Sequence, residues 1–306
     1  MEGKPPLLVV AGPTASGKTA LAIALCLSLG GEVVSADSMQ VYQGMEIATA
    51  KPTAEELRVV SHHLIGFADP AARFSVAGYA PLARAAIADI HARGKLPVLC
   101  GGTGLYIQAV TEGLTLTEGE FGAREDVIAD WQALASIDPT AAAKIHPNDA
   151  KRIARALELY HATGITLTEQ NARSRPEDRS YHTKMLFLHA RERQHLYDRI
   201  DARVDQMLAA GLLGEATLWR QAAGATAAQA IGYKELEPYF LDQCTLEEAV
   251  AHLKQETRRY AKRQLSWFRR MAREWNEREP GSCVELFMED EDMLERALLF
   301  CEKMVV

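Results

Sequence analysis

A glycine-rich segment near the N-terminus, Gly12-Pro13-Thr14-Ala15-Ser16-Gly17-Lys18-Thr19, fits the phosphate-binding pattern G-x-x-x-x-G-K-[ST]. It follows an apolar run at 7–11 and precedes a helical pattern at 17–29, which is the context that the pattern requires. In such a loop, backbone N–H groups at a helix N-terminus face an anion, Lys18 adds a full positive charge, and the Thr19 hydroxyl can ligate Mg²⁺. The segment predicts a site for a diphosphate or triphosphate, with a chance glycine turn that caps a helix as the alternative.

Strand and helix patterns alternate along the first hundred residues. A helix at 17–29 should be closed by Gly30 and Gly31, and Ser75 can cap a helix that runs to Gly94. Short apolar runs bounded by turn residues predict buried strands at 7–11, 32–36, 96–100, 184–190 and 283–287. This alternation is typical of an α/β fold: a P-loop NTPase-like parallel sheet flanked by helices, with a helical C-terminal part.

The middle of the chain carries helical patterns and no strand pattern. Helices are expected around 124–135 and 149–162, separated by prolines and a glycine. We therefore predict a small inserted helical subdomain at 113–180, within a core formed by 1–112 and 181–306.

Two residue groups beyond the phosphate loop follow predicted strands. Asp37 comes directly after the strand at 32–36, and Thr103 lies in the glycine turn after the strand at 96–100. Open α/β sheets place their sites at these strand ends, where a carboxylate can act as a general base or bind a metal through water. An N-cap or turn aspartate is the alternative for Asp37, and a plain β-to-α turn is the alternative for the glycine turn. The D-x-x-G and N-K-x-D patterns of a switch GTPase are absent, which excludes that class.

Charge and cysteine content restrict the partners. The formal net charge of −7, from 34 Lys and Arg against 41 Asp and Glu, would by itself argue against a nucleic-acid partner. The distribution of charge favours such a partner, because 151–204 carries 11 basic and 7 acidic residues, and 251–278 carries 9 basic and 3 acidic residues.

The five cysteines form no C-x-x-C pair, and no leader or membrane segment is evident, so we expect a cytoplasmic protein without structural zinc.

The segment 251–278 shows a one-sided helical pattern. At about 100° per residue, its apolar residues share one face and seven cations fall within an arc of about 140° on the other. The pattern indicates a helix that packs on one side and meets phosphate on the other; a solvated surface helix of mixed charge is the alternative. The seven cations are Arg258, Arg259, Lys262, Arg263, Arg269, Arg270 and Arg273.

Six motifs in order along the chain resemble the tRNA dimethylallyltransferases, also called tRNA isopentenyltransferases, of the bacterial type. They are GPTASGKT at 12–19, ADSMQVYQGMEIATAKP at 36–52, PVLCGGTGLY at 97–106, HPNDAKRIARALE at 146–158, QAIGYKE at 229–235 and AKRQLSWFR at 261–269. The resemblance implies transfer of a dimethylallyl group from its diphosphate to N6 of the adenosine 3′-adjacent to the anticodon, in tRNAs that read codons beginning with U. It implies Mg²⁺ as the cofactor, with Thr19 as its ligand.

The resemblance also implies roles for individual residues. Asp37 would be the general base and Lys18 would stabilise the leaving diphosphate. Thr103 and Arg155 would be catalytic residues near the reacting groups, with Arg155 as an electrostatic stabiliser. The diphosphate would occupy the loop formed by Gly12, Pro13, Thr14, Ala15, Ser16, Gly17, Lys18 and Thr19. The tRNA anticodon stem-loop would contact Asp37, Ser38, Met39, Gln40, Thr103, Arg124, Lys151, Arg152, Ile153, Ala154, Arg155, Gln229, Ala230, Ile231, Gly232, Tyr233 and Lys234. Without the resemblance, 151–155 would be a solvated basic face and 229–234 an ordinary turn.

Other functions share the phosphate loop. An adenylate isopentenyltransferase or a small-molecule P-loop kinase would need the same loop, but neither needs the basic helix. A non-catalytic, ATP-binding RNA-interaction protein would leave Asp37 without a chemical role. We expect a monomer that binds tRNA and dimethylallyl diphosphate and no membrane.

Overall fold

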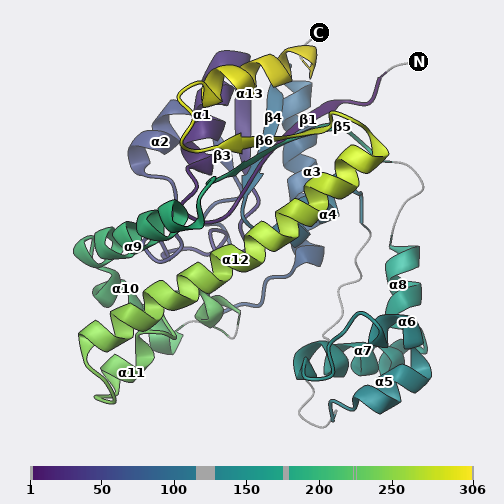
Figure 1. Cartoon of the computed structure of the whole chain (residues 1–306), viewed down its shortest axis with the longest axis vertical. Helices are drawn as coiled ribbons and strands as arrows, with labels where there is room; N and C mark the ends of the chain where they lie inside the picture. The colour runs from purple at the N-terminus through teal and green to yellow at the C-terminus, as the bar shows by residue number, and fades with distance from the viewer. Residues whose placement is uncertain (1–2, 115–127, 175–178, 223, 225, 305–306) are drawn as a thin grey trace. The chain divides into compact units, whose positions relative to one another are not determined.

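The computed structural model describes residues 3–114, 128–174, 179–222, 224 and 226–304, and the chain forms two compact units (Figure 1). The larger unit comprises Met1–Thr111 and Ser180–Val306, and the smaller unit comprises Glu112–Arg179. The smaller unit is therefore an insertion in the sequence of the larger one.

The larger unit is built on a six-stranded sheet in which every strand pair is parallel. The strand order β3-β2-β4-β1-β5-β6 places β1, and the phosphate loop that follows it, inside the sheet. The predicted fold class is confirmed, and each of the five predicted strands is present within two residues of its expected bounds. The strands are β1 Pro6–Ala11, β2 Gly31–Ser35, β3 His62–His63, β4 Leu96–Gly101, β5 His182–His189 and β6 Cys283–Phe287.

Helices cover both faces of this sheet (Figure 1). Ser75 caps α3 as predicted, but only Gly30 closes α1, because Gly31 already pairs with Leu96 in the sheet. The helices of the larger unit are α1 Lys18–Leu29, α2 Ala54–Val59, α3 Val76–Ala92, α4 Gly104–Thr111, α9 Arg193–Ala209, α10 Leu212–Ala222, α11 Glu237–Phe240, α12 Leu246–Arg278 and α13 Met293–Cys301, with 3-10 turns η1 Ala227–Gln229 and η2 Glu302–Met304.

Strand β1 separates two apolar layers. Leu7 and Val9 face the layer that contains residues of α3 and α12, whereas Leu8 and Val10 face the layer that contains residues of α1 and α13. All four side chains are fully buried. A strand that is covered on both faces needs an apolar residue at every position, which explains the continuous run in the sequence.

The longest helix, α12, extends over 33 residues and begins five residues before the predicted start. A capping box between Thr245 and Glu248 starts it: each backbone N–H donates to the side chain of the other residue. The predicted apolar face is buried at Leu253, Phe268 and Trp275. Neither α12 nor any other helix in the described ranges combines the length and apolarity needed to cross a membrane.

The smaller unit has its own apolar core, formed by residues that include Leu134, Ile145, Ile153 and Leu157. The buried Asp138 carboxylate connects two of its helices, since it accepts hydrogen bonds from the backbone and hydroxyl of Thr168 and from the backbone of Ala141. The start of the predicted helix at 124–135 lies outside the described residues. The described helices are α5 Trp131–Ile137, α6 Pro139–Ala142, α7 Ala150–Thr163 and α8 Leu167–Arg173.

Candidate functional site

A cavity of about 1020 Å³ lies in the larger unit where β1, β2 and β4 end. It brings together segments that are far apart in the sequence: the phosphate loop, the segment after β2, helices α9 and α12, and the loop at 229–234. Among the sequence-predicted residues it is lined by Thr14, Ala15, Gly17, Lys18, Thr19, Asp37, Ser38, Met39, Gln40, Gln229, Ala230, Ile231, Gly232 and Lys234.

The phosphate loop has the backbone of an anion-binding loop. Gly17 caps α1 with φ of 91°, a left-handed conformation that favours glycine. At Gly12 a Cβ atom would lie 2.1 Å from the Leu188 carbonyl oxygen, so the loop can pass β5 only with glycine there. Lys18 Nζ donates to the Pro13 carbonyl at 2.7 Å, which keeps the ammonium folded over the loop.

Two hydroxyl groups in the loop have no hydrogen-bond partner among the described residues, and one of them, that of Thr19, faces the cavity. The other is the buried Ser16 Oγ. The described residues contain no cluster of three or more His, Cys, Asp or Glu side chains that could hold a metal. This donor set fits Mg²⁺, which is commonly bound through one or two protein oxygens together with substrate phosphates and water.

Asp37 is held by a turn at the cavity wall. Its Oδ1 accepts hydrogen bonds from the Met39 backbone at 2.9 Å and the Gln40 backbone at 3.4 Å. The turn interpretation of this residue is therefore correct, and it is compatible with a chemical role, because Oδ2 has no hydrogen bond among the described residues. The turn fixes the orientation of the carboxylate in the cavity.

Thr103, which lies just after β4, holds the same turn. Its Oγ1 accepts a hydrogen bond from the Ser38 backbone at 2.9 Å and lies 3.2 Å from the Ser38 hydroxyl, and Thr103 itself is not among the residues that line the cavity. Gln40 also serves the local structure, because its Nε2 donates to the carbonyls of Thr49 and Ala50 and its Oε1 accepts from Ser35. We infer that these two side chains shape the Asp37 segment.

Helix α9 supplies two cations that the sequence analysis missed. Arg199 Nε donates to the Ala15 carbonyl of the phosphate loop at 2.9 Å, and Arg203 also lines the cavity. Burial lowers the pKa of Arg203, and the charge of Asp37 opposes that shift. The four-residue spacing of the two arginines was the available signal, but it is common on any charged helix surface.

Helix α12 contacts the phosphate loop through Gln264, a third residue that the sequence did not single out. Its Oε1 accepts from the Thr14 backbone at 2.8 Å and its Nε2 donates to the Gly102 carbonyl at 2.9 Å. At Gly102 a Cβ atom would lie 2.3 Å from Gln264 Nε2, so glycine is needed at this contact. The basic helix is thus part of the site.

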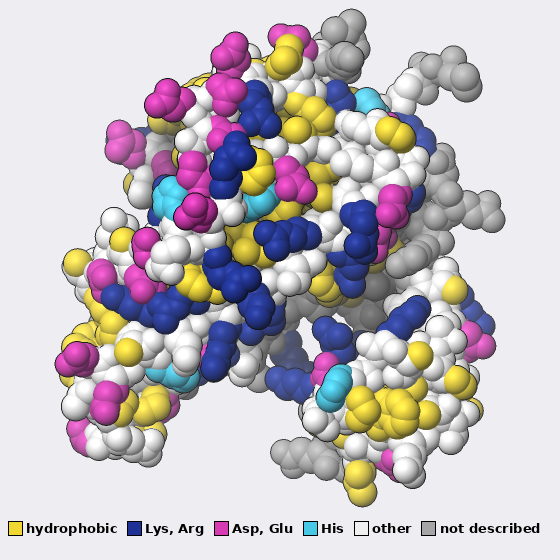
Figure 2. All heavy atoms as spheres, viewed as in Figure 1, with side chains coloured by type: hydrophobic (Ala, Val, Ile, Leu, Met, Phe, Trp, Pro, Cys, Tyr) yellow, Lys and Arg dark blue, Asp and Glu magenta, His cyan; other side chains and the backbone are white. Residues whose placement is uncertain are grey.

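Only some cations of α12 are available to an external anion. Lys254 pairs with Asp205 at 2.6 Å and Arg258 pairs with Asp201 at 2.5 Å, both on α9. Arg258, which was predicted on the phosphate-facing side of the helix, is therefore partly neutralised by α9. Lys262 and Arg269 are exposed and have no ion pair among the described residues. Figure 2 shows that dark-blue side chains follow the diagonal of α12.

The residues predicted at 151–155 lie on α7 of the smaller unit. Lys151 and Arg152 are exposed, with Arg152 Nε 3.4 Å from Asp149, and Ala154 is half-buried. Arg155 is also half-buried, and burial lowers its pKa. The side chain of Ile153 is fully buried in the apolar core of the unit, so an RNA contact at this position would have to be made by its backbone. Arg124 lies outside the described residues.

Tyr233 is the one predicted residue of the loop at 229–234 that does not line the cavity. It is 2% exposed, and its hydroxyl lies 3.0 Å from Glu215 Oε1 on α10. A direct RNA contact through this side chain would need the loop to open. The other five residues of the loop line the cavity.

The affinity of the cavity for a diphosphate is expected to fall as the pH rises above 8. Burial lowers the pKa of Lys18 to about 8, so the ammonium loses its proton above that pH when the cavity holds no anion. A bound anion raises the pKa of Lys18 again. Above pH 8, binding of the diphosphate therefore requires that Lys18 take up a proton, and the affinity falls by up to about tenfold per pH unit. Calorimetric titration with inorganic diphosphate at pH 7, 8 and 9 measures the effect. The arginine of a Lys18→Arg variant stays charged at these pH values, so its affinity should change only with the ligand's own protonation. The same pH dependence in both proteins would contradict the titration of Lys18 as the cause.

Comparison with known proteins identifies close relatives. The profile described as "IPP transferase" matches residues 40–271, and the one described as "Isopentenyl transferase" matches 5–65. A tRNA dimethylallyltransferase of Halalkalibacterium halodurans is 48% identical, over 88% of this chain and 90% of the relative, and that of Bacillus subtilis is 44% identical, over 92% and 94%.

Solved structures of tRNA-modifying transferases are also similar to this chain. A full-length tRNA isopentenylpyrophosphate transferase from Bacillus halodurans matches with a TM-score of 0.72 and 42% identity, over 99% of this chain and 97% of that one. A eukaryotic dimethylallyltransferase, in a structure described as acting on tRNA, matches with a TM-score of 0.80 and 30% identity, over 96% of this chain and 78% of that one.

Proposed function

The chain belongs to the IPP transferase family and is a prenyltransferase that modifies tRNA, and on that premise we propose that its cavity holds dimethylallyl diphosphate beside an adenosine of the anticodon loop. One observation carries the proposal: a phosphate-binding loop and a carboxylate held by a turn line the same cavity. The acceptor would be N6 of the adenosine 3′-adjacent to the anticodon, in tRNAs that read codons beginning with U.

The proposed reaction exchanges one bond for another. The bond between the allylic carbon and the diphosphate oxygen breaks with its electron pair on the oxygen, the bond from N6 to that carbon forms, and N6 loses a proton. Asp37 Oδ2 is the proton acceptor, since Oδ1 is occupied by the turn. A carboxylate suits this role because the adenine N6 lone pair is delocalised and becomes nucleophilic only as its proton leaves.

The phosphate loop stabilises the leaving group. Negative charge grows on the diphosphate as the carbon–oxygen bond breaks, and Lys18, the loop N–H groups and the Arg203 guanidinium are the cations and donors around the cavity. Mg²⁺, held by Thr19 and the diphosphate, would neutralise further charge on the same group. Thr14 to Gly17 provide the remaining loop contacts, and no phosphoryl group is transferred in this proposal.

Recognition of the RNA requires that the adenine leave the anticodon stack. Enzymes that act on a base extrude it into a pocket and hold the backbone through charge. We assign the cavity-facing residues of 229–234 and the segment 37–40 to the extruded nucleotide, and Lys151, Arg152, Arg155 and the free cations of α12 to phosphates. We also propose a monomeric enzyme that acts in the cytoplasm on its tRNA acceptor.

The assay that tests this function uses purified protein, Mg²⁺, labelled dimethylallyl diphosphate, and either tRNA or AMP as the acceptor. Label transferred to tRNA and not to AMP is expected. Transfer to AMP alone would favour the adenylate isopentenyltransferase alternative, and transfer of a phosphoryl group from ATP to a small molecule would favour a kinase.

Removal of Lys262 and Arg269, two exposed cations of α12 without an ion pair among the described residues, is expected to weaken tRNA binding in a salt-dependent way. A Lys262→Gln/Arg269→Gln variant loses up to two phosphate contacts, so the slope of log K against log salt should fall by about 1.4, at about 0.7 for each contact to single-stranded RNA. Filter binding at several salt concentrations measures the slope. Lys254→Gln is the matched control, because Lys254 is already paired with Asp205 and should leave the slope unchanged. An equal slope in the wild type and the double variant would contradict the assignment.

A further inference from the structure

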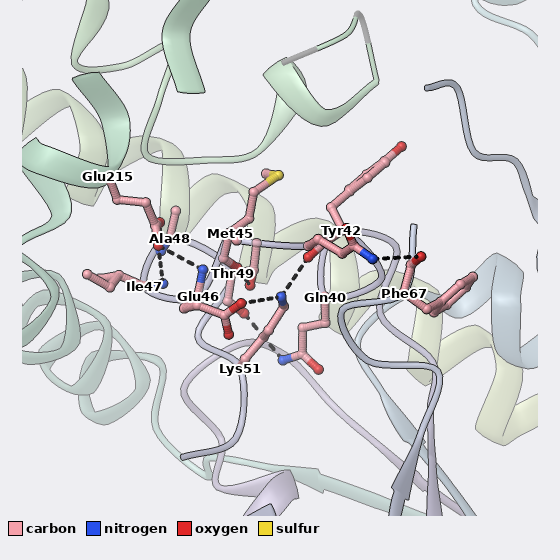
Figure 3. Close-up of polar contacts among 12 residues, drawn as sticks. Gln40, Tyr42, Met45, Glu46, Ile47, Ala48, Thr49, Lys51, Phe67 and Glu215 are labelled. Carbon is pink, nitrogen blue, oxygen red and sulfur yellow. Dashed lines mark hydrogen bonds and ion pairs between the residues drawn. The ribbon is translucent and has the colours of Figure 1, made fainter. Parts of the chain in front are cut away.

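Helix α10 holds the segment between β2 and α2 through two side chains, Glu215, which Figure 3 shows, and Trp219. The Glu215 carboxylate accepts hydrogen bonds from three consecutive backbone N–H groups: Oε2 from Glu46 and Ile47, both at 2.7 Å, and Oε1 from Ala48 at 2.8 Å. One turn further along the helix, Trp219 Nε1 donates to the Gly44 carbonyl at 2.8 Å. These bonds span more than 160 positions of sequence and fix the segment against α10.

The same carboxylate reaches a second wall of the cavity. Tyr233 Oη donates to Glu215 Oε1 at 3.0 Å, and Tyr233 belongs to the loop at 229–234. The two walls also touch directly, because a Cβ atom at Gly232 would lie 3.3 Å from the Ala48 Cβ. Residues 46–48 and Gly232 line the cavity, whereas Glu215 does not. Glu215 therefore joins two cavity walls from outside the cavity.

The chemistry around Glu215 requires a carboxylate. Three of its four partners are backbone N–H groups, which can only donate, and together they form a concave anion site of the kind that consecutive backbone amides make. Glutamine has the same size but places an NH₂ group against at least one of these N–H groups. The N–H group that faces the NH₂ group then loses its acceptor, and the two donors repel each other.

The rest of the segment is fixed by its own contacts. Lys51 Nζ donates to the Tyr42 carbonyl at 2.6 Å and pairs with Glu46 Oε1 at 2.8 Å, and Gln40 Nε2 donates to the Thr49 and Ala50 carbonyls (Figure 3). The segment is thus a preformed unit. The position of this segment against the loop at 229–234 depends on Glu215 and on Trp219, which holds the segment at the Gly44 carbonyl.

We propose that Glu215 is a positioning residue for the tRNA acceptor. It holds the wall formed by 46–48 against the loop at 229–234 and thereby sets the width of the cavity on the side where the nucleotide enters, without contact to the substrate. The proposal rests on the function proposed above, since it concerns the RNA side of that site. The phosphate loop makes no contact with Glu215, so the diphosphate side of the cavity is independent of it.

Steady-state kinetics of Glu215→Gln, with tRNA and dimethylallyl diphosphate varied in turn, test the proposal. The KM for tRNA should rise about tenfold or more, while the KM for dimethylallyl diphosphate stays within about twofold, a split that a general loss of folded protein would not produce. Tyr233→Phe, which removes one hydrogen bond and keeps the ring, should raise the KM for tRNA less. The double variant should resemble Glu215→Gln alone, because both changes disrupt one network.

Glu295→Gln is the matched control: Glu295 is exposed on α13 and has no hydrogen bond or ion pair among the described residues. Wild-type transfer to tRNA in the same assay tests the proposed function separately. An unchanged KM for tRNA in Glu215→Gln, or equal increases in both KM values, would overturn the positioning role. If Glu215→Gln does not fold, an unchanged KM for tRNA in Tyr233→Phe would overturn it.

Discussion

An Asp37→Asn enzyme should bind tRNA normally and transfer the prenyl group about 10²- to 10⁴-fold more slowly, which is the usual contribution of a general base. Asparagine has the size of aspartate and keeps an oxygen that can accept the backbone hydrogen bonds of Met39 and Gln40. The turn should therefore persist, while the atom at the position of Oδ2 becomes an NH₂ group that cannot take a proton from N6. Single-turnover transfer of label to tRNA measures the loss.

Asp37→Ala separates the turn from the chemistry. It removes both the proton acceptor and the turn acceptor, so tRNA binding should weaken somewhat in this variant and not in Asp37→Asn. Filter binding of tRNA to both proteins distinguishes the two effects. Transfer by Asp37→Asn at a rate close to that of the wild type would remove Asp37 from the role of base.

The backbone of the site could be predicted because it depends on local patterns. The phosphate loop lies between a strand and a helix as its sequence pattern requires, and Asp37 follows β2 because parallel strands end at one edge of the sheet. The two-residue strand β3, His62-His63, carries no such pattern. It exists because β2 has a free edge beside it, which is a property of the assembled sheet.

The partners of individual side chains could not be predicted, because they come from distant parts of the chain. Arg199 meets a carbonyl 184 positions away, Gln264 meets the Thr14 backbone 250 positions away, and nothing local distinguishes either residue from its neighbours. The helical period predicted the polar and apolar faces of α12 correctly. It could not indicate that Asp201 on α9 neutralises Arg258, because that pairing depends on how two helices pack.

A family motif predicts which segment lies at the site, but not which of its side chains face the ligand. A family motif names consecutive positions, but a helix turns successive side chains in different directions. Ile153, between Arg152 and Arg155 in the predicted RNA segment, therefore points into the core of the smaller unit. In the same way Tyr233, in the loop at 229–234, reaches back to Glu215 while Gly232 lines the cavity.

Lys18→Ala should reduce kcat/KM for dimethylallyl diphosphate by about 10²- to 10³-fold, comparable to the loss of one preorganised donor from a transition-state site. The ammonium already lies over the phosphate loop, bonded to the Pro13 carbonyl, so little reorganisation is needed when the diphosphate enters. Since charge on the diphosphate increases as the carbon–oxygen bond breaks, kcat should fall more than the affinity for substrate. Lys18→Arg keeps the charge and should recover part of the rate. The KM for tRNA should stay within about twofold of the wild type in both variants, because Lys18 faces the leaving group. A variant whose only defect is a higher KM for tRNA would show that the loop serves RNA binding instead of the departure of diphosphate.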